Sequence, residues 1–79
     1  MKLSIHSLQK TLYDGEVEKI IARTTSGEIT VLEGHIPLIS SLVGPWLQII
    51  DKKGKESVIA VESGFIEVRP ENEVVVLTN

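Results

Sequence analysis

The sequence predicts an all-β protein: a two-layer antiparallel β-sandwich of about ten short strands, forming a single domain over residues 1–79. Two observations carry this prediction. First, apolar and polar residues alternate in several segments, as they do around Leu3 and Ile5. Second, turn-forming residues recur roughly every 8–12 residues, a rhythm that is typical of sandwiches and barrels. A chain of 79 residues leaves room for only one such domain.

The expected strands share alternation or an abundance of β-branched and aromatic residues. They are Lys2–Ser7, Val17–Thr24, Glu28–Leu32, Trp46–Ile50, Ser57–Val61, Phe65–Val68 and Val74–Leu77. The expected breaks between them share Gly, Pro, Asn or Asp, the residues that favour turns. They are Asp14-Gly15, Ser26-Gly27, Glu33-Gly34, Gly44-Pro45, Lys53-Gly54 and Pro70-Glu71-Asn72.

One stretch, His35–Val43, fits two structures. Its apolar residues recur at helical spacing, and Pro37 suits the first turn of a helix. The stretch is short, however, and Gly44-Pro45 closes it. We therefore favour an extended segment here.

Two expected strands are apolar on both faces. In Ser57–Val61 and in Val74–Leu77, apolar residues follow one another without alternation. Because a two-layer sandwich covers only one face of each sheet, a second apolar face suggests a partner surface. Single exposed apolar residues are also normal, so both interpretations stand. Phe65 and Trp46 are expected in the core.

The charge balance argues against nucleic acid as a partner. The net charge is −3, with 11 acidic and 8 basic residues, whereas nucleic-acid binding needs a basic stripe. No apolar run reaches the length of a membrane span and no signal peptide opens the chain, so we expect a cytoplasmic protein without direct lipid insertion. The absence of cysteine excludes disulfides.

No catalytic, cofactor-binding or metal-binding residues are predicted. His6 and His35 lack the spacing of a metal motif, and no phosphate-binding glycine loop is present. Neither Ser40 nor Ser41 lies in a G-x-S-x-G nucleophile motif.

One chemical alternative stays open. Asp51-Lys52-Lys53-Gly54 places lysines at an expected hairpin tip. Lipoyl and biotinyl carrier domains are acidic β-modules of about this size that display a modifiable lysine on a hairpin. A charged hairpin tip is also ordinary surface chemistry.

Four segments, taken together, resemble the epsilon-subunit family of proton-translocating ATP synthases. Residues 27–42, GEITVLEGHIPLISSL, resemble the family's G-E-[IL]-x-V-L-P-x-H-A-P-L-[ILV]-[ST]-x-L. Residues 13–20, 60–68 and 72–77 resemble its other motifs in the same order and spacing. Glu33 replaces the usual proline, Ile36 the usual alanine and Ser63 a glycine.

The resemblance implies a non-catalytic rotor subunit of the central stalk, without a cofactor. In the family, the sandwich clamps to the gamma subunit and rests on the membrane c-ring, so that proton flow is coupled to ATP synthesis. The subunit would then lie on the cytoplasmic face of a bacterial membrane, peripheral through the complex. A helical hairpin usually follows the sandwich; this chain ends before it, either as a short member or as a fragment, so no helical domain or regulatory role is expected.

The resemblance also implies two groups of contact residues. On the c-ring side it marks Glu28, in a turn that could pair with basic loop residues. On the gamma side it marks a set of polar and apolar residues around the His35 loop: Ser7, His35, Ile36, Pro37, Leu38 and Ser40.

Overall fold

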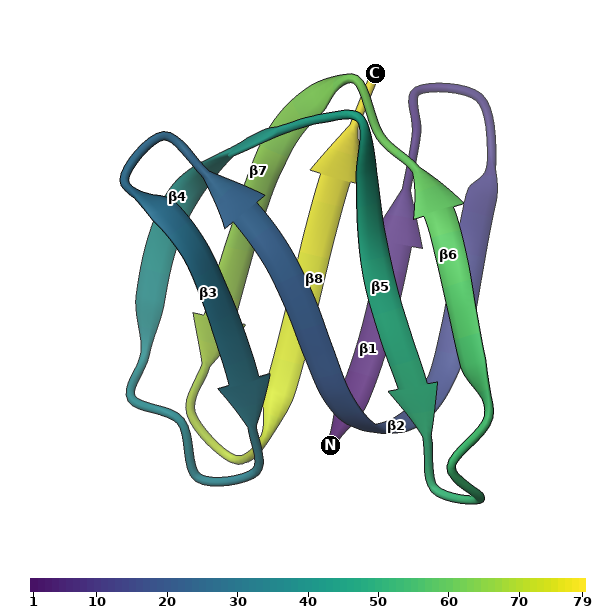
Figure 1. Ribbon diagram of the computed structural model, residues 1–79, viewed down its shortest axis with the longest axis vertical. Coiled ribbons are helices and arrows are strands. Elements are labelled where there is room, and N and C mark those ends of the chain that lie inside the picture. The colour runs from purple at the N-terminus through teal and green to yellow at the C-terminus, as the bar shows by residue number, and fades with distance from the viewer.

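Eight strands and no helix form the chain in the computed structural model, which describes all of residues 1–79. Figure 1 shows the strands in two layers, so the predicted all-β sandwich is confirmed, with eight strands where about ten were expected. The strands are β1 (Lys2–His6), β2 (Thr11–Thr24), β3 (Gly27–Leu32), β4 (Leu38–Val43), β5 (Trp46–Asp51), β6 (Glu56–Ala60), β7 (Ser63–Arg69) and β8 (Glu73–Thr78).

The long strand β2 belongs to both layers. Strands β1, β8, β7 and β4 are hydrogen-bonded in that order in one layer, and β3, β2, β5 and β6 make the other (Figure 1). Residues 11–16 of β2 pair with β1, and its later residues pair with β3 and β5. At its end, Thr24 pairs with Leu42 of β4, so the layers are joined along two sides like a flattened barrel. Only β1 and β8 pair in parallel.

The turn predicted at Asp14-Gly15 is wrong. Both residues lie inside β2, where Gly15 pairs with Leu3 and Asp14 with Ser4. Pairing with β1 supplies the backbone hydrogen bonds that a turn would otherwise have made locally. The dipeptide lies in the part of β2 that precedes its crossing from one layer to the other (Figure 1).

The stretch His35–Val43 contains no helix, which confirms the extended prediction. Residues 38–43 form β4, which pairs along its whole length with β7, from Leu38↔Val68 to Val43↔Ser63. Residues 35–37 connect it to the turn after β3. Pairing with β7 thus determines the extended conformation of a segment whose apolar spacing alone fits either a helix or a strand.

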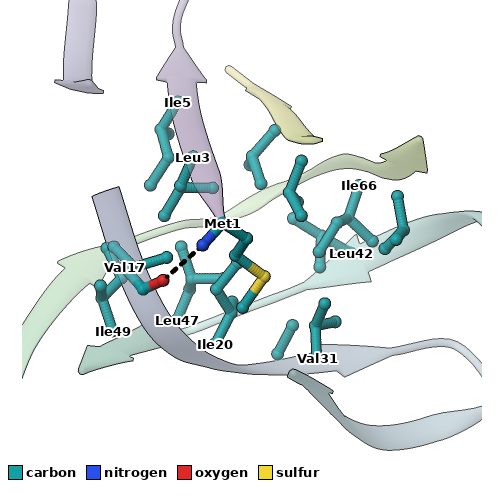
Figure 2. Close-up of a cluster of buried hydrophobic side chains, with 14 of the residues drawn as sticks. Met1, Leu3, Ile5, Val17, Ile20, Val31, Leu42, Leu47, Ile49 and Ile66 are labelled. Carbon is teal, nitrogen blue, oxygen red and sulfur yellow. Dashed lines mark hydrogen bonds between the residues drawn. The ribbon is translucent and has the colours of Figure 1, made fainter. Parts of the chain in front are cut away.

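The core fills the space between the layers. Side chains from seven of the strands, from Met1 and from Val61 interdigitate there, and Leu3, Ile5, Ile20 and Ile66 are fully buried (Figure 2). Burial of each such side chain contributes roughly 1.5–3 kcal/mol. Met1 is also buried, and its ammonium group donates a hydrogen bond of 3.0 Å to the Val17 carbonyl.

The hairpin between β5 and β6 is organised by one carboxylate. Asp51 Oδ1 accepts hydrogen bonds from the backbone N–H groups of Lys53 (2.8 Å) and Lys55 (2.9 Å). These bonds favour the charged carboxylate and lower the pKa of Asp51, the bond from Lys55 most strongly and then that from Lys53. The tip therefore has a defined conformation, with Gly54 at φ 83°.

Candidate docking surface

The outer side of the β1-β8-β7-β4 layer carries a continuous set of apolar side chains. Along β7 and β8, buried residues alternate with residues that face outward, as strand geometry requires. The outward residues include Phe65, 56% exposed, and its cross-strand partner Leu77, 53% exposed. On β4 the outward Ile39 is 73% exposed. We call Ile39, Phe65, Val75 and Leu77 the outer apolar surface.

Two hollows lie on either side of the Phe65–Leu77 pair. The larger, about 460 Å³, is lined mainly by uncharged residues of β4, β7 and β8 and by Leu8 of the β1–β2 loop. The smaller, about 270 Å³, is lined by Ile39 and Val75 and by the charged residues Glu67 and Arg69. Because Phe65 and Leu77 line both hollows, the two form one continuous, mostly apolar depression on the surface.

One end of this surface is charged. Arg69 donates through Nε to Glu67 Oε1 at 3.0 Å and through Nη1 to Glu73 Oε1 at 3.3 Å. These hydrogen bonds, first that with Glu67 and then that with Glu73, raise the pKa of Arg69 above its ordinary value. Two carboxylates around one guanidinium leave this end with a net negative charge, so it favours a basic group on a partner.

The loop between β3 and β4 holds three of the six predicted gamma-side residues, His35, Ile36 and Pro37, at one end of the molecule. The Gly34 N–H donates to Asn72 Oδ1 at 2.8 Å, which ties this loop to the β7–β8 turn. His35 Nδ1 donates to the Ile36 carbonyl at 2.7 Å, so its ring is engaged within the loop. Ile36, 74% exposed, and Pro37 project toward solvent beside it.

The remaining predicted gamma-side residues lie elsewhere. Leu38 packs against the core and Ser40 is half-buried on the same inward side of β4, while Ile39 between them faces outward. Ser7 lies in the β1–β2 loop, at the opposite end of the layers from the β3–β4 loop (Figure 1). The structure therefore brings His35, Ile36 and Pro37 together and leaves Ser7 apart from them.

Glu28 lies in β3 next to the β2–β3 turn, exposed and paired across the strands with Arg23. The turn is closed by the Thr24 hydroxyl, which donates to the Gly27 carbonyl at 2.8 Å and accepts from the Ser26 N–H at 3.1 Å. Figure 1 places this turn at the end of β3 away from the β3–β4 loop. Glu28 is thus at the opposite end of the domain from His35, Ile36 and Pro37, and at the same end as the β1–β2 loop that carries Ser7 (Figure 1).

Sequence reasoning missed the outer apolar surface. Phe65 was expected in the core but faces outward, because Gly64 and Ile66 occupy the inward positions of β7. The signal was present in Val74–Leu77, where apolar residues occupy both faces of the strand. Trp46, also expected in the core, is half-buried at the start of β5.

The polar side chains of the domain form neither an unpaired buried group nor a metal-ligand cluster. No buried side-chain nitrogen or oxygen lacks a hydrogen-bond partner, and no three or more His, Cys, Asp and Glu side chains gather around one point. At the β5–β6 hairpin, the Lys52 ammonium lies 3.9 Å from Glu16. The chain contains no helix long and apolar enough to cross a membrane.

Fold and surface together define a small β-sandwich whose distinguishing feature is an exposed apolar face. Its sequence matches the family described as ATP synthase, Delta/Epsilon chain, beta-sandwich domain, over residues 1–79. The chain belongs to this family. This match favours the epsilon-subunit interpretation of the sequence and gives no support to the alternative of a lipoyl or biotinyl carrier.

Curated relatives of the chain are ATP synthase epsilon chains. The ATP synthase epsilon chain of Shouchella clausii is 41% identical over 73 residues, which cover 91% of this chain and 53% of the relative. That of Desulforudis audaxviator is 44% identical over 78 residues, covering 99% and 56%. The chain thus spans about half the length of the curated relatives it matches.

Solved structures show the same fold. A chain in the Euglena gracilis mitochondrial ATP synthase, a structure of OSCP/F1/c-ring, superposes with a TM-score of 0.90 at 26% identity, covering 96% of this chain and 48% of that one. A chain from the Tetrahymena thermophila mitochondrial ATP synthase, central stalk/c-ring, superposes with a TM-score of 0.79 at 17% identity, covering 99% and 62%. The second likeness concerns the fold alone.

Proposed function

We propose that this chain is a non-catalytic rotor domain of the central stalk of a proton-translocating ATP synthase. It docks the gamma subunit to the membrane c-ring and so couples proton flow to ATP synthesis. It is held at the cytoplasmic face of a bacterial membrane through the complex. Family membership over residues 1–79 supports the proposal, as does the Euglena neighbour from an F1/c-ring assembly.

The observation that carries the docking role is the outer apolar surface. Exposed Phe65, Leu77 and Ile39 would be unfavourable on a free domain, and such patches mark protein contacts. We assign this surface and the adjoining Ile36–Pro37 loop to gamma. Glu28, at the opposite end, is assigned to the c-ring, where an exposed carboxylate would fix register with basic loops.

Co-expression with the gamma subunit of the same source tests the proposal. We expect a stable complex on size-exclusion chromatography, and we expect Phe65→Ser to weaken it at least tenfold, because an apolar anchor is removed from the contact centre. Val58→Ser is the matched control, since Val58 is similarly exposed, at 62%, but lies on β6 in the other layer. Failure to form a complex, or equal loss with both variants, would contradict the proposal.

A further inference from the structure

We propose that Leu8 is a rigid anchor that inserts into an apolar hollow of the partner, beside an amphipathic helix that packs over Phe65 and Leu77. This inference rests on the proposed docking function and adds a residue to it. Leu8 is 95% exposed, more than any other large apolar residue of the chain. A fully hydrated leucine on a tight loop is unfavourable in the free domain and becomes favourable when a partner buries it.

The loop around Leu8 is fixed by one hydroxyl. Ser7 Oγ donates to the Lys10 carbonyl at 3.1 Å and accepts from the N–H groups of Gln9 at 3.3 Å and Lys10 at 3.2 Å. The Ser7 N–H also donates to the Lys10 carbonyl at 2.8 Å. Both residues that flank Leu8 are therefore bound within the loop. An anchor held in place before binding loses less conformational entropy in the complex.

Leu8 also continues the outer apolar surface. It stands at the rim of the larger hollow, whose other apolar lining includes Phe65 and Leu77. The polar side chains of that lining, from Ser41, Ser63, Thr78 and Asn79, are uncharged. A partner that covers Phe65 and Leu77 therefore meets Leu8 without crossing a charged boundary.

The backbone beneath this surface excludes strand addition as the way a partner binds. β7 is hydrogen-bonded to β4 and β8, and β8 to β7 and β1, so neither has a free edge that could accept another strand. The partner must bind through side chains, which suits an amphipathic helix with apolar residues at i, i+3 and i+4. The acidic end at Glu67 and Glu73 favours a basic residue at the corresponding end of that helix.

Binding of the purified gamma subunit to variants of the chain tests the anchor. We expect Leu8→Ala to raise Kd at least about 30-fold, mainly through faster dissociation. Leu8→Met, which keeps the apolar volume, should bind within about threefold of the original chain. Ser7→Ala should raise Kd by about three- to tenfold while Leu8 itself is unchanged, because the loop loses the three hydrogen bonds of the hydroxyl and keeps only the backbone bond to Lys10.

The outcomes separate the anchor from the docking function. If Leu8→Ala binds as tightly as the original chain while Phe65→Ser is impaired, the anchor proposal is overturned and the docking function stands. If neither variant is impaired, both are overturned. A photo-crosslinking amino acid at position 8 should label gamma at apolar residues spaced three or four apart; labelling confined to a polar loop would overturn the helix assignment.

Discussion

Replacing Gly64 with alanine tests the most crowded glycine position in the domain. Gly64 lies in β7, paired with Leu42 of β4 and Thr78 of β8. A Cβ atom at this position would lie 2.0 Å from the Leu77 carbonyl oxygen and 3.0 Å from the Thr78 Cα. Both obstacles are backbone atoms, so no rotamer change can relieve the clash. β8 must move by about 1 Å to restore even a 3.0 Å separation.

The expected cost follows from that displacement. Overpacking of a tight site typically costs about 1–3 kcal/mol, and each ladder hydrogen bond that is disrupted adds about 1 kcal/mol. We expect Gly64→Ala to lower the free energy of unfolding by about 3 kcal/mol, which is a large fraction of the total for a domain of this size. The corresponding fall in Tm is roughly 12–24 °C, measured by thermal denaturation followed by circular dichroism.

Gly15→Ala is the control, because it makes the same chemical change in a strand with room for it. The nearest atom to a Cβ at Gly15 is the Tyr13 hydroxyl oxygen at 3.6 Å, an ordinary contact. Its effect on the free energy of unfolding should stay within about 0.5 kcal/mol. If Gly64→Ala were as stable as Gly15→Ala, the close approach of β7 and β8 would be refuted.

Three further predictions follow from particular contacts. Glu71 has φ 65°, a left-handed conformation that costs a non-glycine residue about 1–2 kcal/mol. Glycine relieves that cost but loses about 0.5–1 kcal/mol to the greater freedom of the unfolded chain, so Glu71→Gly should raise Tm by roughly 2–8 °C in the same assay. Because the pKa of Asp51 is lowered in the folded protein, its charged form stabilises the fold at pH values above the ordinary pKa of 3.8, and this contribution is lost as pH falls through the lowered pKa. Asp51→Asn should therefore make the free energy of unfolding, measured by urea titration at pH 2–5, depend less steeply on pH. An unchanged slope would contradict this. Titration calorimetry with gamma should show that Ile36→Asp raises Kd at least about 30-fold and Glu28→Ala less than about fivefold. The reason is that an unpaired buried charge costs far more than a charge at the rim of an interface contributes. The reverse order would refute the assignment of Ile36 to gamma and of Glu28 to the c-ring.

Local patterns were sufficient to predict the fold class. Alternation in Lys2–Ser7 and turn chemistry at Lys53-Gly54 and Pro70-Glu71-Asn72 reflect short-range geometry, and all three reappear in the structure. Asp14-Gly15 failed because a distant strand, β1, satisfies its backbone. Its conformation depends on pairing that no local pattern encodes.

The contact surface was harder to predict than the fold. Ile36 and Pro37 are exposed in a loop, where a motif maps directly onto the surface. In a strand, a shift of one position changes the face: Ser40 lies on the inward side of β4, and its neighbour Ile39 faces outward. Phe65 shows the same limit, since its side of β7 follows from the pairing with β4 and β8 and not from its own apolar character.

The passage of β2 from one layer to the other has a mechanical consequence. Its 14 residues run without interruption from the β1–β2 loop, which carries Leu8, to the β2–β3 turn beside Glu28. A force applied at one of these points reaches the other along covalent backbone, flanked by hydrogen bonds to β1, β3 and β5. Two layers held only by side-chain packing could slide over each other under such a load. In the proposed rotor, β2 makes the two layers move as one body. Rotation of the c-ring would then turn gamma with little deformation of the domain between them.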